Sequence, residues 1–228
     1  MSPSQPTGAA IFFNLMTELG IEVIFGHTGG AVIPLHVELN RRMRAGQPAP
    51  KFIMCRQEGG AGHAAEGFAR ASGRIGVALV TSGPGATNLT TPIADAFKDS
   101  IPTVFITGRV PSAAIGTDAF QEVDTVGVTR PISKHNYLVR DVADLEATLR
   151  EAFALAASGR PGPVVVDICK DVQLAGLTEA RRGRCRHKHT VPFDAAAADT
   201  LLAALARAQR PVVKAGGGII HANASRSL

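Results

Sequence analysis

Three glycine-containing turns carry the residues of this sequence that are best suited to chemistry. They span residues 26–30, 56–60 and 81–88, and each follows an apolar run and leads into a helical pattern. Glycines at such turns let a ligand approach the backbone closely, and the start of a helix offers free N–H groups. An ordinary strand-to-helix turn looks the same, so each turn taken alone leaves a binding role and a purely structural role open.

Glu58 is the side chain in these turns with the most definite chemical use. It stands at the expected start of a helix, where a carboxylate can simply favour the helix dipole. A partly buried carboxylate at this position could instead transfer protons. In the third turn, Gly83, Pro84 and Gly85 form a rigid segment that is poor in side chains and suits a flat ring. Ser82 as an N-cap, with Pro84 in the first turn, describes an ordinary helix start equally well.

The elements that must position these turns alternate regularly between strands and helices. The run at 76–81 lacks polar alternation, which is typical of a strand buried on both faces. This β–α repetition predicts an α/β fold, a doubly wound parallel six-stranded sheet flanked by helices, with ligands bound at the carboxyl ends of the strands. Strands are expected at 22–25, 51–55, 76–81, 103–107, 137–139 and 163–168, and helices at 6–19, 31–43, 58–72, 87–97 and 142–157.

The domain organisation follows from a change in composition after residue 173. Residues 1–173 contain the whole β–α pattern, and residues 174–192 are rich in Arg, Gly and Lys, which predicts a linker. Residues 193–228 offer a helix at 195–208, a strand at 211–215 and a glycine turn at 216–218. One helix, one strand and a turn cannot bury a hydrophobic core by themselves. We therefore expect this part to be the truncated start of a second α/β domain.

Charge, hydropathy and cysteine content narrow the function classes. The net charge is +5, and five basic residues between 181 and 188 account for it. A local run without an aromatic or recognition-helix pattern predicts a solvated linker rather than nucleic-acid binding. No apolar run reaches roughly 18 residues, so no membrane partner is expected. The three cysteines lack metal-type spacing and the N-terminus lacks a signal-peptide pattern, which favours a reducing, cytoplasmic location.

Longer motifs resemble a known family. The runs at 58–70 and 81–88 together are similar to the pyrimidine-binding domain of thiamine diphosphate enzymes. The stretches at 115–122, 129–139 and 158–167 look like the large catalytic subunit of acetolactate synthase, also called acetohydroxyacid synthase. The resemblance implies thiamine diphosphate-dependent decarboxylation of pyruvate and carboligation to a second 2-oxo acid, a transferase reaction in valine, leucine and isoleucine biosynthesis.

The resemblance also assigns roles to individual positions. Glu58 matches the glutamate that hydrogen-bonds N1′ of the aminopyrimidine, and Gln121 matches a glutamine near the reacting centre. His27, Thr28, Thr81, Pro84 and Asn88 match contacts to thiamine diphosphate. Arg160, Gly216 and Gly217 match contacts to a non-redox FAD, and Gly30, Phe120 and Lys170 match the substrate side. The Gly-Asp-Gly…Asn motif that binds the diphosphate through Mg²⁺ is absent, so no metal ligand is expected in this sequence.

Departures from the family pattern keep alternatives open. His27 and Thr28 stand where Tyr-Pro is usual, and Gln57 and Gly59 where His and Gln are usual. These changes suit another carboligase or decarboxylase of the same superfamily, such as a glyoxylate carboligase, whereas the motif at 116–121 favours acetolactate synthase. A non-catalytic module is the third hypothesis. The resemblance further implies a homodimer, a regulatory small subunit and a missing C-terminal catalytic half, without which this chain is expected to be inactive.

Overall fold

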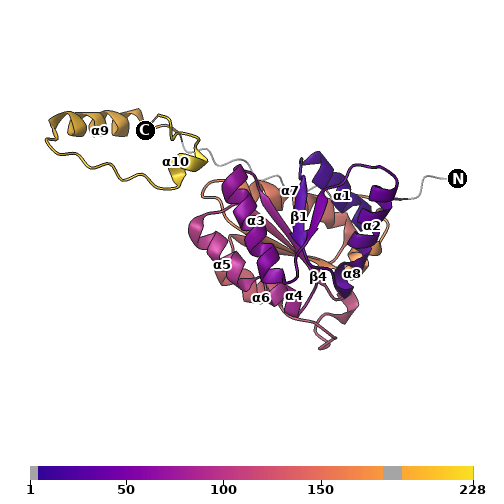
Figure 1. The fold of residues 1–228 in the computed structure, drawn as a ribbon. Helices are drawn as coiled ribbons and strands as arrows, with labels where there is room; N and C mark the ends of the chain where they lie inside the picture. The colour runs from indigo at the N-terminus through magenta and orange to yellow at the C-terminus, as the bar shows by residue number, and fades with distance from the viewer. Residues whose placement is uncertain (1–4, 182–191, 228) are drawn as a thin grey trace. The chain divides into compact units, whose positions relative to one another are not determined.

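A computed structural model describes residues 5–181 and 192–227 (Figure 1). The chain forms two compact units, Met1–Arg186 and His187–Leu228. The division between them falls within residues 182–191. That segment contains Cys185 and most of the basic run predicted as a linker, and it lies outside the described residues.

The first unit is built on one six-stranded sheet in which every pair of neighbouring strands is parallel. The strand order is β2-β1-β3-β4-β6-β5, so the chain moves outward from β1 to β2 and then returns to place β3 on the other side of β1. The predicted parallel six-stranded sheet is thereby confirmed. Its strands are β1 (Val23–Gly26), β2 (Lys51–Met54), β3 (Gly76–Val80), β4 (Thr103–Arg109), β5 (His135–Val139) and β6 (Val164–Cys169).

Burial along the strands explains their order. Every residue of β3, β4 and β6 is buried, and β3 and the first half of β6 consist of apolar residues alone. The edge strands β2 and β5 keep exposed positions. Strands covered by helices on both faces need apolar side chains on both sides, so such runs take the centre of a parallel sheet. β4 continues to Arg109, two residues past the expected end, because it stays paired with β6 as far as Cys169.

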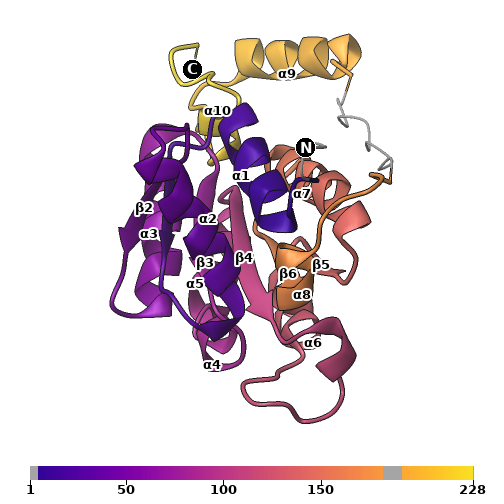
Figure 2. The same ribbon diagram turned by 90° about the vertical axis from the view of Figure 1, so that its right-hand side faces the viewer.

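Helices cover both faces of the sheet (Figures 1 and 2). α3 (Glu58–Ser72) and α5 (Thr90–Asp99) pack on one face, where Ala65, Leu89 and Ile93 meet side chains of β3 and β4. The larger apolar cluster lies on the other face, under α1 (Gly8–Glu18), α2 (Ile33–Arg44), α7 (Val142–Ala157) and α8 (Lys170–Leu174). Shorter helices complete the unit: η1 (Gly30–Val32), α4 (Pro84–Thr87), η2 (Ser112–Ala114), α6 (Thr125–Thr129) and η3 (Arg130–Ile132).

α3 has the predicted bounds, and its ends show why. Gln57 caps the first turn by accepting a hydrogen bond from the Gly60 amide at 2.7 Å. Gly73 ends the helix with a φ of 70°, a left-handed conformation that glycine adopts without a steric penalty. Small residues along the buried side of α3 let it approach α5 closely. A Cβ added at Gly62 would lie 2.4 Å from Cγ of Pro92.

Other boundaries shifted for local reasons. The helix expected at 87–97 is two helices, α4 and α5, because Pro84 starts the first helix directly after Gly83. The helix expected at 31–43 begins with the 3₁₀ turn η1 before α2. Among the described residues, no helix is both long and apolar enough to cross a membrane.

The second unit contains α9 (Ala195–Arg207) and α10 (Gly218–His221) within its described part, 192–227. The helix predicted at 195–208 is confirmed as α9. The strand predicted at 211–215 is wrong: these residues form no strand, and Val212 is 92% exposed. An apolar run becomes a strand only beside another strand that takes up its backbone hydrogen bonds, and this unit provides none within its described residues.

Two alanine substitutions in α3 test the close packing of the helices. Gly62→Ala is expected to lower the free energy of unfolding by about 1–3 kcal/mol, because the new methyl group meets the rigid Pro92 ring. Gly67→Ala is the matched control, since a Cβ there meets no atom within 4 Å. It should leave stability unchanged or raise it by up to about 1 kcal/mol through helix propensity. Urea unfolding of both variants measures the difference, and equal effects would contradict the packing argument.

Candidate functional site

A cavity of about 560 Å³ opens at the carboxyl ends of the central strands. The segments that follow β1, β3, β4 and β6 form its wall together with the start of α3. It lies across β1 and β3, where the winding of the sheet reverses, and open α/β sheets bind ligands at such a position. The cavity brings together most of the predicted contact residues: His27, Thr28, Gly30, Glu58, Thr81, Pro84, Phe120, Gln121 and Lys170.

Glu58 presents one fixed and one open oxygen. It is the first residue of α3 and is half-buried, as expected. The Asn88 amide donates a hydrogen bond to its Oε2 at 2.9 Å, which joins two predicted site residues. Among the described residues, Oε1 has no hydrogen-bond partner. A Cβ added at Gly85 would lie 3.6 Å from Oε1, so this oxygen faces a backbone without a side chain.

The turn after β1 is held tightly against the end of β3. The Ala31 amide donates to Oγ1 of Thr81 at 3.2 Å. A Cβ at Gly29 would lie 2.5 Å from the Thr81 Cβ, so only glycine permits this approach. Nδ1 of His27 lies 2.7 Å from the carbonyl oxygen of Cys55, a contact in which the ring nitrogen is the donor. That hydrogen bond leaves Nε2 as the second polar atom of the ring beside the cavity.

The segment that carries Phe120 and Gln121 closes one side of the cavity. Phe120 is 88% exposed and lies at the rim. Gln121 has a φ of 59°, an uncommon conformation for a residue other than glycine. The carbonyl oxygen of Gln121 would lie 2.6 Å from a Cβ at Gly83, whose own φ is 59°. Glycine at position 83 is therefore required both by its conformation and by the approach of the neighbouring segment.

Two charged residues of the site region were not predicted from the sequence. Arg109, at the end of β4, lines the cavity although it is only 6% exposed. Its Nη1 lies 3.4 Å from Oδ2 of Asp167, which is fully buried in β6. Thr107 donates a 2.6 Å hydrogen bond to the other carboxylate oxygen. The runs 103–110 and 164–169 each contain a single charged residue, and this was the signal that could have identified both residues.

Burial raises the pKa of the Asp167 carboxyl to about 7, and the Thr107 hydrogen bond and the Arg109 charge oppose that effect. Removing a carboxylate from water disfavours its charged form. The charged side chains on the cavity wall are Glu58, Arg109 and Lys170. Because cations outnumber carboxylates there, the cavity favours an anionic ligand.

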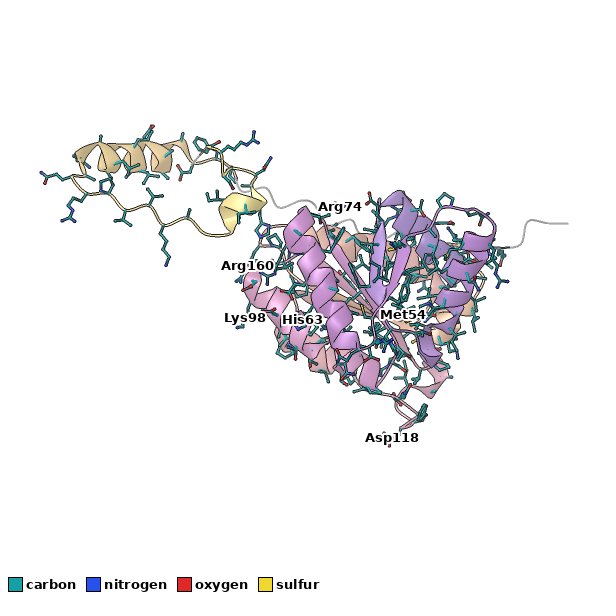
Figure 3. All side chains as sticks on the ribbon, viewed as in Figure 1. Met54, His63, Arg74, Lys98, Asp118 and Arg160 are labelled. Carbon is teal, nitrogen blue, oxygen red and sulfur yellow. The ribbon has the colours of Figure 1, made fainter. Side chains whose placement is uncertain are left out.

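Four predicted residues do not line this cavity. Asn88 is connected to it through its hydrogen bond to Glu58. Arg160 donates hydrogen bonds to Oγ of Ser100 at 2.6 Å and to the Lys98 carbonyl at 3.0 Å, so it caps the end of α5 (Figure 3). Gly216 and Gly217 belong to the second unit, directly before α10. Their assignment to FAD stays a prediction.

The unusual residues beside Glu58 accommodate one another. The Gln57 amide oxygen that caps α3 would lie 2.9 Å from a Cβ at Gly59. A side chain at position 59 would thus compete with the cap, so the two departures from the family pattern are structurally linked.

One cluster of potential metal ligands occurs among the described residues, and it lies elsewhere. His63 and Glu66 of α3 approach Asp95 of α5. Glu66 already pairs with Arg70 at 2.5 Å, and none of these residues lines the cavity.

Comparison with known proteins gives a consistent result. Residues 6–128 match the family described as thiamine pyrophosphate enzyme, N-terminal TPP binding domain. The chain is 46% identical to an acetolactate synthase of Mycobacterium bovis over 230 residues. It is 44% identical to the acetolactate synthase large subunit of Corynebacterium glutamicum and to the mitochondrial catalytic subunit of Saccharomyces cerevisiae. These alignments include 98%, 100% and 97% of the chain but 36%, 36% and 33% of the relatives. The chain thus spans about a third of their length.

The buried carboxyl group makes a prediction about pH. Folded Asp167 keeps a proton up to about pH 7, whereas the unfolded carboxyl loses it near its ordinary value of 3.8. Its contribution to the free energy of unfolding therefore falls as pH rises from about 4 to about 7, by at most on the order of 4 kcal/mol. Asp167→Asn should remove this fall, which urea unfolding at several pH values measures.

Comparing the natural chain with the Asp167→Asn variant isolates the effect of Asp167 on the pH dependence of stability. Burial lowers the pKa of His36, which acts in the opposite direction over part of the same interval. That contribution is common to both proteins and cancels in their difference. Parallel stability curves for the natural chain and the Asn variant would show that Asp167 is not the titrating group.

Proposed function

The chain belongs to the thiamine pyrophosphate enzymes, and from this premise we propose that its first unit supplies the aminopyrimidine side of an acetolactate synthase active site. The observation that carries the proposal is the state of Glu58. One of its oxygens is fixed by Asn88 and the other is open toward a cavity bordered by a glycine turn. A carboxylate held in this way suits a repeated proton exchange with a ring nitrogen.

The residues present fit the pyrimidine part of thiamine diphosphate. Gly85 leaves the backbone beside Glu58 without a side chain, and Pro84 stiffens the turn that carries it. A flat ring needs such a surface on one side and a hydrogen-bonding group at its edge, which Glu58 supplies. When bound, thiamine diphosphate supplies a carbon nucleophile that attacks the keto carbon of pyruvate and allows carbon dioxide to leave.

The chain's own groups have distinct tasks in this proposal. Oε1 of Glu58 hydrogen-bonds the ring nitrogen and moves a proton to and from it. Lys170 and Arg109 give the cavity the positive character that attracts a 2-oxo acid anion. The Gln121 amide, at the wall of the cavity, orients the substrate by hydrogen bonding, and Phe120 shields the approach from water.

Further parts of the family's chemistry are proposed for the larger assembly. The diphosphate and Mg²⁺ need residues that this sequence does not contain, so the chain by itself is expected to be inactive. FAD contacts through Arg160, Gly216 and Gly217, pairing with a second copy and a regulatory small subunit belong to the same proposal. The free thiols of Cys55 and Cys169 support a reducing location such as the cytoplasm.

Replacing Glu58 tests the proposal. The chain is joined to the remaining two thirds of the Corynebacterium glutamicum relative, which gives a hybrid protein of the relatives' length. With pyruvate, thiamine diphosphate, Mg²⁺ and FAD, the hybrid should form acetolactate. Glu58→Gln should lower kcat by about 10²–10⁴-fold, because the amide cannot exchange the proton.

The control is Glu22→Gln, which changes an exposed carboxylate that pairs with Arg74 away from the cavity. It should leave activity unchanged. Full activity of the Glu58→Gln hybrid would overturn the proposed role. Glyoxylate offered in place of pyruvate tests the alternative carboligase, which would turn over glyoxylate in preference.

A further inference from the structure

The segment between η2 and α6 holds a conformation that needs support. We call residues 116–122 the rim loop, because Phe120 and Gln121 stand in it at the edge of the cavity. Gly116, Asp118 and Gln121 all have positive φ values, of 83°, 55° and 59°. Figure 3 places Asp118 at the end of a projection from the body of the unit. Two residues other than glycine in left-handed conformations persist only where their surroundings hold them.

Glu122 closes the rim loop from inside. Its Oε1 accepts a hydrogen bond from the Gly116 amide at 2.6 Å, and its Oε2 accepts one from the Ala119 amide at 3.3 Å. These hydrogen bonds lower the pKa of the Glu122 carboxyl, the contact with Gly116 being the largest cause. One carboxylate at the end of the rim loop, that of Glu122, therefore binds both Gly116 at its start and Ala119 in its middle.

Arg109 fastens the closed loop to the sheet. Its Nη1 donates a hydrogen bond to the Val123 carbonyl, and its Nη2 lies 3.5 Å from Oε1 of Glu122. The same Nη1 also lies 3.4 Å from Oδ2 of Asp167, and Thr107 donates a hydrogen bond to the other oxygen of that carboxylate. Since Arg109 and Asp167 lie in the paired strands β4 and β6, the guanidinium connects a projecting loop to the most deeply buried part of the fold.

Arginine suits this task because its planar group presents several donors in fixed directions, whereas lysine offers a single point of charge. A contact with a second segment completes the support. Gly83 brings the turn after β3 so near to Gln121 that a methyl group would not fit between them. The rim loop is thereby held between the sheet and the glycine turn.

We propose that Arg109 is a positioning residue, which anchors the rim loop through Glu122 and Val123 and so sets where Gln121 and Phe120 stand over the cavity. The anchoring itself is independent of the reaction, and only its effect on turnover rests on the proposed function.

Hydrogen exchange in the chain and kinetics in the hybrid protein test this role together. In Arg109→Lys and Glu122→Gln, the Gly116 and Ala119 amides should exchange at least about fivefold faster, because loop hydrogen bonds are weakened. Amides of β6 should exchange as before. In the hybrid, the same substitutions should lower kcat/KM for pyruvate by about 10–100-fold, since misplacing a substrate contact by about 1 Å has an effect of that size.

The matched control is Arg150→Lys, which disturbs the ion pairs with Glu18 and Glu146 on the surface of α1 and α7. It should change neither hydrogen exchange in the rim loop nor the kinetics of the hybrid.

If β6 exchange shows that Arg109→Lys has unfolded, Glu122→Gln decides the question, because its side chain belongs to the loop. Unchanged exchange at Gly116 and Ala119 would overturn the anchoring. Faster exchange with unchanged kcat/KM would overturn the positioning role, whereas an inactive unmutated hybrid would count against the proposed function alone.

Discussion

Parallel pairing of fully buried strands is the constraint on which the rest of this structure depends. The neighbouring strands β3, β4 and β6 have no exposed residue, so their direction and register are fixed by burial on both faces. Their carboxyl ends, with that of β1, therefore come together at one edge. Residues that are far apart in the sequence, such as His27, Thr81 and Lys170, line one cavity for this reason. The site is a consequence of the sheet rather than of any single motif.

Glycine makes the second contribution, through close approach. Gly29 brings the first turn against Thr81, and Gly83 brings the third turn against Gln121. In both contacts the neighbouring segment fills the space that a Cβ would occupy, so only glycine lets these segments meet beside the cavity. The open oxygen of Glu58 lies next to Gly85, another glycine of the cavity wall. Rigid turns on a rigid sheet give the carboxylate a fixed direction before any ligand arrives.

This arrangement includes two buried charged residues. Asp167 and Arg109 stand among apolar strands, and burial raises the pKa of the carboxyl to about 7. A buried ion pair contributes little net stability. It is better explained by what it holds, because Arg109 reaches from β4 to Glu122 and Val123 and connects the sheet to the rim of the cavity.

The sequence by itself determined the fold class, the bounds of α3 and α7, and the three turns that meet at the cavity. These follow from local patterns, namely apolar runs, helix caps and glycine turns, which act over a few residues. Tertiary structure decided the rest. The apolar run at 211–215 is not a strand, because no neighbouring strand pairs with it in the described part of its unit. Arg109 became part of the site because pairing with β6 extended β4, and Gln57 became a helix cap because Gly59 left room for its amide. Such outcomes depend on which distant backbone lies alongside, and a pattern read along one chain does not contain that information.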